Sequence, residues 1–154
     1  MIETSSVSAT NNGNADIAVI GLAVMGQNLI LNLNDHGFTV CAYNRTVSKV
    51  HDFLQNEAKG TKVIGAESLE EMVNKCKQSP RKVLLMVKAG DAVDEFIERL
   101  VPLLSRGDIV VDGGNSHFND TERRYKRLES VGLLYAGLGV SGGEEGARDG
   151  PRVL

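Results

Sequence analysis

The chain alternates short apolar runs with longer segments in which apolar residues recur every three or four positions. The short runs predict buried strands, and the longer segments predict amphipathic helices. The predicted strands are residues 17–20, 38–43, 62–64, 82–87, 108–112 and 133–138. The predicted helices are residues 25–35, 47–59, 68–75, 91–104 and 119–130. Such an alternation indicates an α/β fold with a mostly parallel sheet covered by helices on both faces.

Length and patterning together predict one folded domain. Residues 1–15 show no hydrophobic period, so we expect a flexible amino-terminal arm. The chain has 154 residues, which allows one ordinary domain and leaves little room for a second. We therefore expect a single domain over residues 16–151, followed by a short end at 152–154.

The overall charge argues against binding to nucleic acid or to an anionic membrane. The chain holds 17 Lys and Arg against 20 Asp and Glu, a net charge of −3, which gives no positive field for nucleic acid or an anionic membrane. No apolar run approaches the roughly 18 residues of a membrane-spanning helix, and residues 1–15 lack the Lys or Arg of a targeting signal. We therefore expect a cytoplasmic protein.

Cys41 and Cys76 lack metal-ligand spacing and are expected to be reduced structural thiols.

The loop after the first predicted strand has the spacing of a dinucleotide-binding turn. In an open α/β fold, ligands bind beyond the carboxyl ends of the strands. Residues 21–26 read Gly-Leu-Ala-Val-Met-Gly, the G-x-G-x-x-G pattern with Ala23 in the middle position. Gly21 would make the tight turn and Gly26 would allow close helix packing, while the amino end of the helix would face a diphosphate. Structural turns also use glycine pairs, so this loop alone is a weak signal.

The second predicted strand is followed by Asn44, Arg45 and Thr46, in the region where NAD-binding domains usually place Asp or Glu for the ribose 2′-hydroxyl. A carboxylate there repels a 2′-phosphate, whereas Arg45 can pair with it bidentately while Asn44 and Thr46 donate neutral hydrogen bonds. The sequence therefore favours NADP over NAD. The alternative makes Arg45 a solvated residue and Thr46 the N-cap of the next helix.

Two further loops follow predicted strands. Lys88, in a Val-Lys-Ala-Gly loop, is either a ligand contact or a surface charge. Asn115 follows two glycines, which allow close approach of a ligand that needs both a donor and an acceptor. The alternative for this turn is a helix N-cap formed by Ser116 or Asn119.

The last predicted strand leads into a glycine-dense segment, residues 139–148, that also carries Ser141, two Glu and an Arg. Its backbone N–H groups and the hydroxyl group can wrap around a carboxylate or phosphate. A flexible linker is the alternative.

The remaining polar residues predict structural roles. His36 precedes a helix-stopping glycine and is expected to cap that helix. The run at residues 122–127 is most simply the solvated face of a helix. His117 follows the Gly-Gly-Asn turn and is therefore expected near the ligand-binding site. No cluster indicates a metal site.

Taken together, the loops resemble one protein family. The motifs that carry the resemblance are Gly21-Leu22-Ala23-Val24-Met25-Gly26-Gln27-Asn28, Asn44-Arg45-Thr46, Val87-Lys88-Ala89-Gly90, Asp112-Gly113-Gly114-Asn115-Ser116 and Val140-Ser141-Gly142-Gly143-Glu144-Glu145-Gly146-Ala147-Arg148. In this order they are similar to the amino-terminal domain of decarboxylating 6-phosphogluconate dehydrogenases. The resemblance covers nearly everything from Asp16 to Pro151.

The resemblance implies a Rossmann-type, doubly wound fold with NADP as the cofactor. The family oxidises the 3-hydroxyl of 6-phosphogluconate and releases CO2 to give ribulose 5-phosphate, in the oxidative pentose phosphate pathway. The implied cofactor-binding residues are Gly21, Leu22, Ala23, Val24, Met25, Gly26, Asn44, Arg45, Thr46, Val87, Lys88, Ala89 and Asn115. The implied substrate-binding residues are Asn115, Ser141, Gly142 and Gly143.

The resemblance also implies what this sequence lacks. Family members continue into a large helical domain that supplies the catalytic lysine base, the glutamate acid, most substrate contacts and the homodimer interface. Here Arg152 and Val153 already differ from the family's Ser-Leu, and the chain stops at Leu154. Because the reaction needs both a proton acceptor and a proton donor, we expect a truncated, inactive cofactor domain without catalytic residues of its own.

Two other functions stay open at this point. A related β-hydroxyacid dehydrogenase, such as a hydroxyisobutyrate or tartronate semialdehyde enzyme, shares the fold and the glycine loops, but it fits Asn44-Arg45-Thr46 and Asn115 less closely. The other possible function is that of a folded, catalytically inactive module for dinucleotide binding or for interaction. Turnover with the respective hydroxy acids distinguishes these possibilities.

Overall fold

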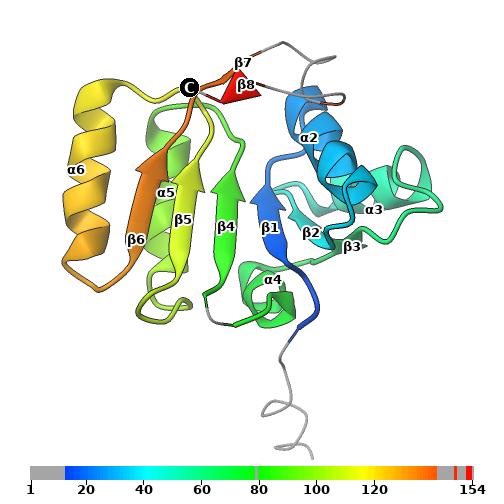
Figure 1. Cartoon of the computed structure of the whole chain (residues 1–154), viewed down its shortest axis with the longest axis horizontal. Coiled ribbons are helices and arrows are strands. Elements are labelled where there is room, and N and C mark those ends of the chain that lie inside the picture. Colours follow the sequence, from blue (N-terminus) through cyan, green and yellow to red (C-terminus); the bar gives the residue numbers. More distant parts are fainter. Residues whose placement is uncertain (1–12, 79, 142–147, 149–151, 154) are drawn as a thin grey trace, which may run out of the picture.

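A computed structural model shows a six-stranded sheet in which every strand pair is parallel (Figure 1). The structure describes residues 13–78, 80–141, 148 and 152–153. The strands of the sheet are β1 (Ile17–Ile20), β2 (Val40–Tyr43), β3 (Ile64–Gly65), β4 (Lys82–Leu85), β5 (Ile109–Asp112) and β6 (Leu134–Gly137). Their order is β3-β2-β1-β4-β5-β6, so the connections reverse direction between β1 and β4. This doubly wound order confirms the predicted α/β fold.

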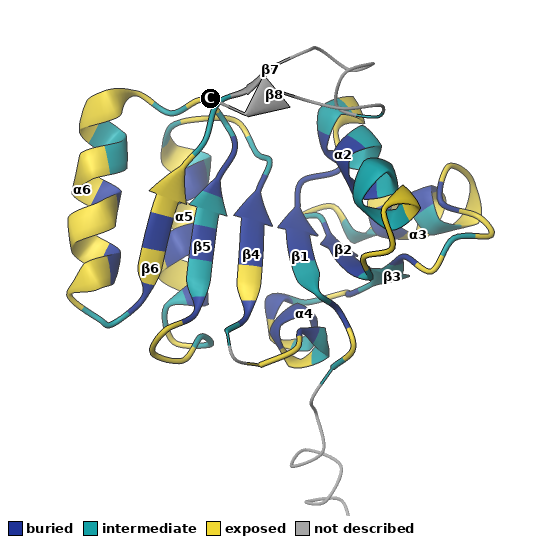
Figure 2. Cartoon of the chain, viewed as in Figure 1, coloured by how far each residue is buried: buried dark blue, intermediate teal, exposed yellow. Residues whose placement is uncertain are grey.

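Helices lie on both faces of the sheet. They are α2 (Val24–Asp35), α3 (Val47–Gln55), α4 (Leu69–Lys75), α5 (Asp91–Leu100) and α6 (Phe118–Glu129). Ile30 of α2 and Phe53 of α3 pack in one buried cluster, while Phe96 of α5 and Leu128 of α6 belong to a second cluster that also contains residues of α4. The central strands therefore lie between two apolar layers, which accounts for their continuous apolar sequence (Figure 2).

The edge strand β6 departs from that continuous burial. Tyr135 is buried in it, whereas its neighbour Leu134 is 56% exposed. The strand β5 likewise alternates between buried and partly buried positions. Full burial on both faces therefore holds for the centre of the sheet and not for this edge.

Several elements are shorter than the sequence predicts. The predicted helix at 47–59 ends at Gln55, because the following residues turn and bury Ala58. The predicted helix at 91–104 ends at Leu100, two residues before Pro102, whose ring removes a backbone donor from the helix interior. The strand predicted to begin at residue 38 begins at Val40, because the chain first turns through Gly37 with φ of +92°.

The sequence did not predict a small antiparallel pair, β7 (Val140–Ser141) with β8 (Arg152–Val153). Residues expected to form a short end thus pair with the segment after β6. The predicted substrate residues Gly142 and Gly143 lie outside the described residues, and for Ser141 the structure describes only the backbone.

The amino-terminal part of the described chain is packed. Ala15, the last residue of the predicted arm, is fully buried and pairs with Cys76. Residues 1–12 of that arm lie outside the described residues.

Cys41 and Cys76 are free and buried, as predicted, and burial raises the pKa of the Cys41 thiol to about 12. None of the helices in the described ranges has the length and apolar character that crossing a bilayer requires.

Candidate functional site

The glycine loop packs tightly against the loop that follows β4. Gly21 has φ of +115°, and a Cβ atom there would lie 2.3 Å from the Met86 carbonyl oxygen. A Cβ atom on Gly26 would lie 2.1 Å from the Gly21 carbonyl oxygen. Both contacts exclude any side chain, whereas Ala23 is exposed and its methyl group is tolerated. The first and last glycines of the pattern are therefore required by the geometry, and the middle one is not.

The amino end of α2 begins directly at this loop. Its N-cap residue, Ala23, makes no side-chain capping bond, and its first turn holds no acidic residue. The first N–H groups of a helix have no partner within the helix, and the helix dipole makes that end positive. Gln27 stabilises the loop because its Nε2 donates to the Leu22 carbonyl oxygen at 2.9 Å. This end of α2 is thus suited to bind an anion such as a diphosphate.

Asn44 ties the end of β2 to the glycine loop. Its Oδ1 accepts a hydrogen bond from the Leu22 backbone N–H at 2.9 Å, and its Nδ2 donates to the Thr46 carbonyl oxygen at 3.1 Å. Thr46 occupies the N-cap position of α3, but its side chain makes no capping bond. Asn44 therefore orients the loop, and its predicted contact with a 2′-phosphate stays a prediction.

Arg45 is half-exposed and contacts α5. Its Nη2 forms an ion pair with Glu95, and its guanidinium lies 5.2 Å from the centre of the Phe96 ring. Tyr43 supports the same ring in an edge-to-face contact at 6.5 Å. The guanidinium is thus partly solvated and also lies over an aromatic ring.

The loops after β4 and β5 meet beside the glycine loop. A Cβ atom on Gly114 would lie 2.4 Å from the Val87 carbonyl oxygen. Asn115 follows, exposed and with φ of +60°, a conformation that L-residues other than glycine rarely adopt. A cavity of about 360 Å³ extends from Asn115 to Gly139, just after β6. Lys88 and Ala89 are exposed in the neighbouring loop.

The three histidines have structural contacts. His36 is the C-cap of α2, and its Nδ1 lies 2.8 Å from the Asn32 carbonyl oxygen. His51 pairs with Glu67 at 2.9 Å. His117, rather than Ser116 or Asn119, is the N-cap of α6. In the part of the chain that the structure describes, no group of three or more His, Cys, Asp or Glu is arranged to hold a metal ion.

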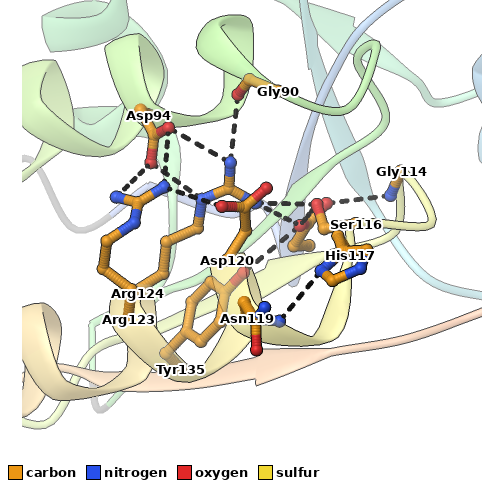
Figure 3. Close-up of polar contacts among 11 residues, drawn as sticks. Gly90, Asp94, Gly114, Ser116, His117, Asn119, Asp120, Arg123, Arg124 and Tyr135 are labelled. Atoms are coloured by element: carbon orange, nitrogen blue, oxygen red, sulfur yellow. Dashed lines mark hydrogen bonds and ion pairs between the residues drawn. The ribbon is translucent and has the colours of Figure 1, made fainter.

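The prediction that residues 122–127 form a solvated helix face is wrong for Arg124. Its side chain is 1% exposed and forms ion pairs with Asp94 at 2.8 Å (Figure 3) and with Asp112 at 3.3 Å. The helix turns Arg124 to the same side as the buried Leu128, four residues later. The four-residue spacing between Arg124 and Leu128 was the sequence signal that could have predicted this burial, but the charged residues around Arg124 obscured it.

This network predicts a specific loss of stability in acid. Hydrogen bonding from Arg124 lowers the pKa of the Asp94 carboxyl group from 3.8 to about 2. Because the pKa is lower in the folded state, the contribution is complete above about pH 5 and is lost as the pH falls towards about 2. After allowance for solvent screening it is worth about 1 to 2 kcal/mol. Denaturant unfolding should show a smaller acid-induced loss in Asp94→Asn than in the wild type, and an unchanged loss would contradict this interpretation.

A family model and several relatives agree on 6-phosphogluconate dehydrogenase. Residues 16–154 match the family model described as the NAD binding domain of 6-phosphogluconate dehydrogenase. The decarboxylating 6-phosphogluconate dehydrogenase of Homo sapiens is 70% identical over 140 residues, which cover 91% of this chain and 29% of the relative. The Drosophila melanogaster enzyme is 68% identical over 143 residues, 93% of this chain and 30% of the relative. The chain thus spans about three tenths of the length of these relatives.

A solved structure of the same enzyme agrees with this result, and a more distant one shares the fold. A Plasmodium falciparum 6-phosphogluconate dehydrogenase, solved in its apo form and in complexes with its cofactor NADP+ and its substrate 6-phosphogluconate, superposes with a TM-score of 0.85 at 42% identity. The match covers 91% of this chain and 30% of that one. A 3-hydroxyisobutyrate dehydrogenase of Mycobacterium tuberculosis, at 22% identity and a TM-score of 0.72, covers 86% of this chain and 42% of that one and shares the fold alone. Because the family model extends over the whole parallel sheet and the loops at its carboxyl edge, this chain belongs to the family of NAD-binding domains of 6-phosphogluconate dehydrogenase.

Proposed function

We propose that this chain binds NADP as the cofactor domain of a decarboxylating 6-phosphogluconate dehydrogenase. The observation that carries the proposal is the segment after β2. NAD-binding domains usually have an acidic residue in this region, whereas this chain has Asn44-Arg45-Thr46, with Arg45 held over Phe96. A guanidinium at this place attracts a 2′-phosphate, which NAD lacks. The relatives at 70% and 68% identity support the choice of this enzyme over a β-hydroxyacid dehydrogenase, whose likeness rests on the fold.

In this proposal, each loop binds a different part of the cofactor. The N–H groups at the start of α2 bind the diphosphate, and Gly21 and Gly26 let it approach the backbone. Arg45 binds the 2′-phosphate, with Asn44 and Thr46 beside it. NADP accepts a hydride from the sugar acid when it is bound.

At the other end of the cofactor, we assign the remaining predicted contacts. Val87, Lys88 and Ala89 contact the dinucleotide along the loop after β4. Asn115 contacts both the nicotinamide and 6-phosphogluconate, and its amide can donate and accept. Ser141, Gly142 and Gly143 bind the sugar acid. The position of Asn115 at the mouth of the cavity beside β5 supports this arrangement.

The proposal limits what these 154 residues do alone. By resemblance, the lysine base and the glutamate acid belong to the part of the family's sequence that the present chain does not match. We therefore propose that the chain binds NADP without oxidising 6-phosphogluconate. A cytoplasmic location and a homodimer with the rest of the enzyme belong to the same proposal.

Two assays on one preparation test this proposal. The purified chain is incubated with NADP and 6-phosphogluconate while NADPH absorbance is followed, and NADP binding is measured in parallel by equilibrium dialysis. We expect binding without turnover. NADPH formation by these residues alone would overturn the proposed inactivity, and absence of binding by a folded sample would overturn the cofactor role.

Glu95 is expected to compete with the cofactor for Arg45. Its carboxylate pairs with the Arg45 guanidinium, and both side chains are about half exposed. Glu95→Gln should therefore tighten NADP binding by about two- to fivefold, the value of an exposed ion pair, and leave NAD binding unchanged. The matched control is Glu98→Gln, which removes a carboxylate of α5 that pairs with Arg127 instead. Equal effects of the two substitutions would contradict the competition.

A further inference from the structure

The buried carboxylate of Asp112 holds the residues on either side of Asn115. Its side chain is fully buried at the end of β5. Its Oδ1 accepts a hydrogen bond from the Gly114 backbone N–H at 2.9 Å, and its Oδ2 accepts one from the Ser116 hydroxyl. Tyr135 of β6 donates to the same Oδ2 at 3.2 Å. The residue before Asn115 and the residue after it are thus fixed to one anchor.

Arg124 connects this anchor to the neighbouring loop. Its Nη1 donates to the Ser116 hydroxyl at 2.8 Å and to Asp112 at 3.3 Å. Its Nη2 donates to the Gly90 carbonyl oxygen at 3.0 Å, where the loop after β4 enters α5 (Figure 3). Its Nε donates to Asp94 at 2.8 Å. One guanidinium therefore fixes the loops after β4 and β5 relative to each other.

The backbone of Asn115 is in the left-handed region. Its φ of +60° is more accessible to asparagine than to other residues with a side chain, but it still costs energy that the surroundings can offset. Gly114 is pressed against the Val87 carbonyl oxygen on one side, and the Ser116 hydroxyl is held on the other. Asn115 itself remains exposed at the cavity mouth.

We infer that Arg124 and Asp112 are positioning residues that hold the Asn115 amide in place for the nicotinamide end of the cofactor. The inference rests on the proposed function. A buried ion pair contributes little net stability compared with apolar residues of the same volume. The fixed geometry of the pair matters more than its stability here. Every hydrogen bond that the Arg124 and Asp112 side chains make to other residues ends on a loop at the carboxyl edge of the sheet, on the start of α5 or on β6. Neither side chain needs to touch the cofactor for this role.

Binding of two ligands separates positioning from general stability. NADP spans the whole site, whereas adenosine 2′,5′-bisphosphate carries the 2′-phosphate and lacks the nicotinamide. Arg124→Lys keeps the charge but loses the fork that reaches Asp94, Gly90 and Asp112 at once. By calorimetry we expect this variant to bind NADP about three- to tenfold more weakly, the effect of one misplaced hydrogen bond, with the bisphosphate unchanged. The matched control is Arg127→Lys, one turn along α6, whose exposed pair with Glu98 lies away from the loops.

A double-mutant cycle tests whether Arg124 acts through Asn115. In an Asn115→Ala background, Arg124→Lys should weaken NADP binding much less than it does in the wild type. Ser116→Ala, which removes one link without removing a buried charge, should weaken NADP in the same direction and serves if Arg124→Lys fails to fold.

Three results would overturn the inference. Equal weakening of both ligands would show a merely structural role, and an unchanged NADP affinity in folded Arg124→Lys and Ser116→Ala would show no role. Full additivity in the cycle would mean that Arg124 does not act through Asn115. A folded wild-type chain that binds neither ligand would instead overturn the proposed function, and this inference with it.

Discussion

Replacing Arg45 with alanine is expected to weaken NADP binding about 10- to 100-fold while changing NAD binding less than about twofold. A hydrogen bond to a charged group is worth about 1.5–3 kcal/mol, and we propose that Arg45 provides one to the 2′-phosphate. Calorimetric titrations of both dinucleotides at the same salt concentration measure the two changes. Salt must be fixed, because half-exposed charges are screened.

Two further variants refine the Arg45 prediction. Arg45→Lys keeps the charge without the planar fork, so its NADP affinity should lie between those of wild type and Arg45→Ala. Arg99 also lies over Phe96, at 5.7 Å from the ring centre, and Arg99→Ala controls for loss of that contact. Similar losses for NADP and NAD in Arg45→Ala would contradict the 2′-phosphate role.

Replacing Gly21 with alanine should abolish binding of both dinucleotides and destabilise the fold by about 3 kcal/mol or more. The added methyl group would meet the Met86 carbonyl oxygen at 2.3 Å, in a backbone conformation with φ of +115°. The loop must therefore move away from the start of α2, where the diphosphate is expected to bind. Thermal unfolding and dinucleotide titration measure the two effects.

Gly37 provides the matched control for this substitution. It also has a positive φ, +92°, but a Cβ atom there would meet no atom within 4 Å. Gly37→Ala should therefore cost only the backbone strain, about 1 kcal/mol, and leave dinucleotide binding intact. If the two alanine variants lose the same stability and the same affinity, the close approach of Gly21 to Met86 is not what the loop requires.

The sequence predicted the sheet because its central strands are buried on both faces. Such strands read as continuous apolar runs, and β1, β2 and the part of β4 after Lys82 are of this kind. The ends of elements were less predictable: α5 stops before Pro102, and α3 stops where Ala58 is buried in a turn. These ends depend on local turns and tertiary burial rather than on periodicity.

The candidate site was predictable where backbone conformation limits the residue type. Gly21 and Gly26 occupy positions that exclude a side chain, so their spacing is visible in the sequence. Arg124 was missed because a buried arginine among exposed charges has no distinguishing composition, and its partners Asp94 and Asp112 are 30 and 12 residues away. Only the fold brings these three residues together.

The most direct test of the cofactor role is a calorimetric titration of the purified chain with NADP and, separately, with NAD. Circular dichroism on the same sample establishes that the chain is folded. We expect NADP to bind at least about tenfold more tightly than NAD, the effect of one charged hydrogen bond. Equal affinities, or tighter binding of NAD by a folded sample, would contradict the proposal that this domain is built for NADP.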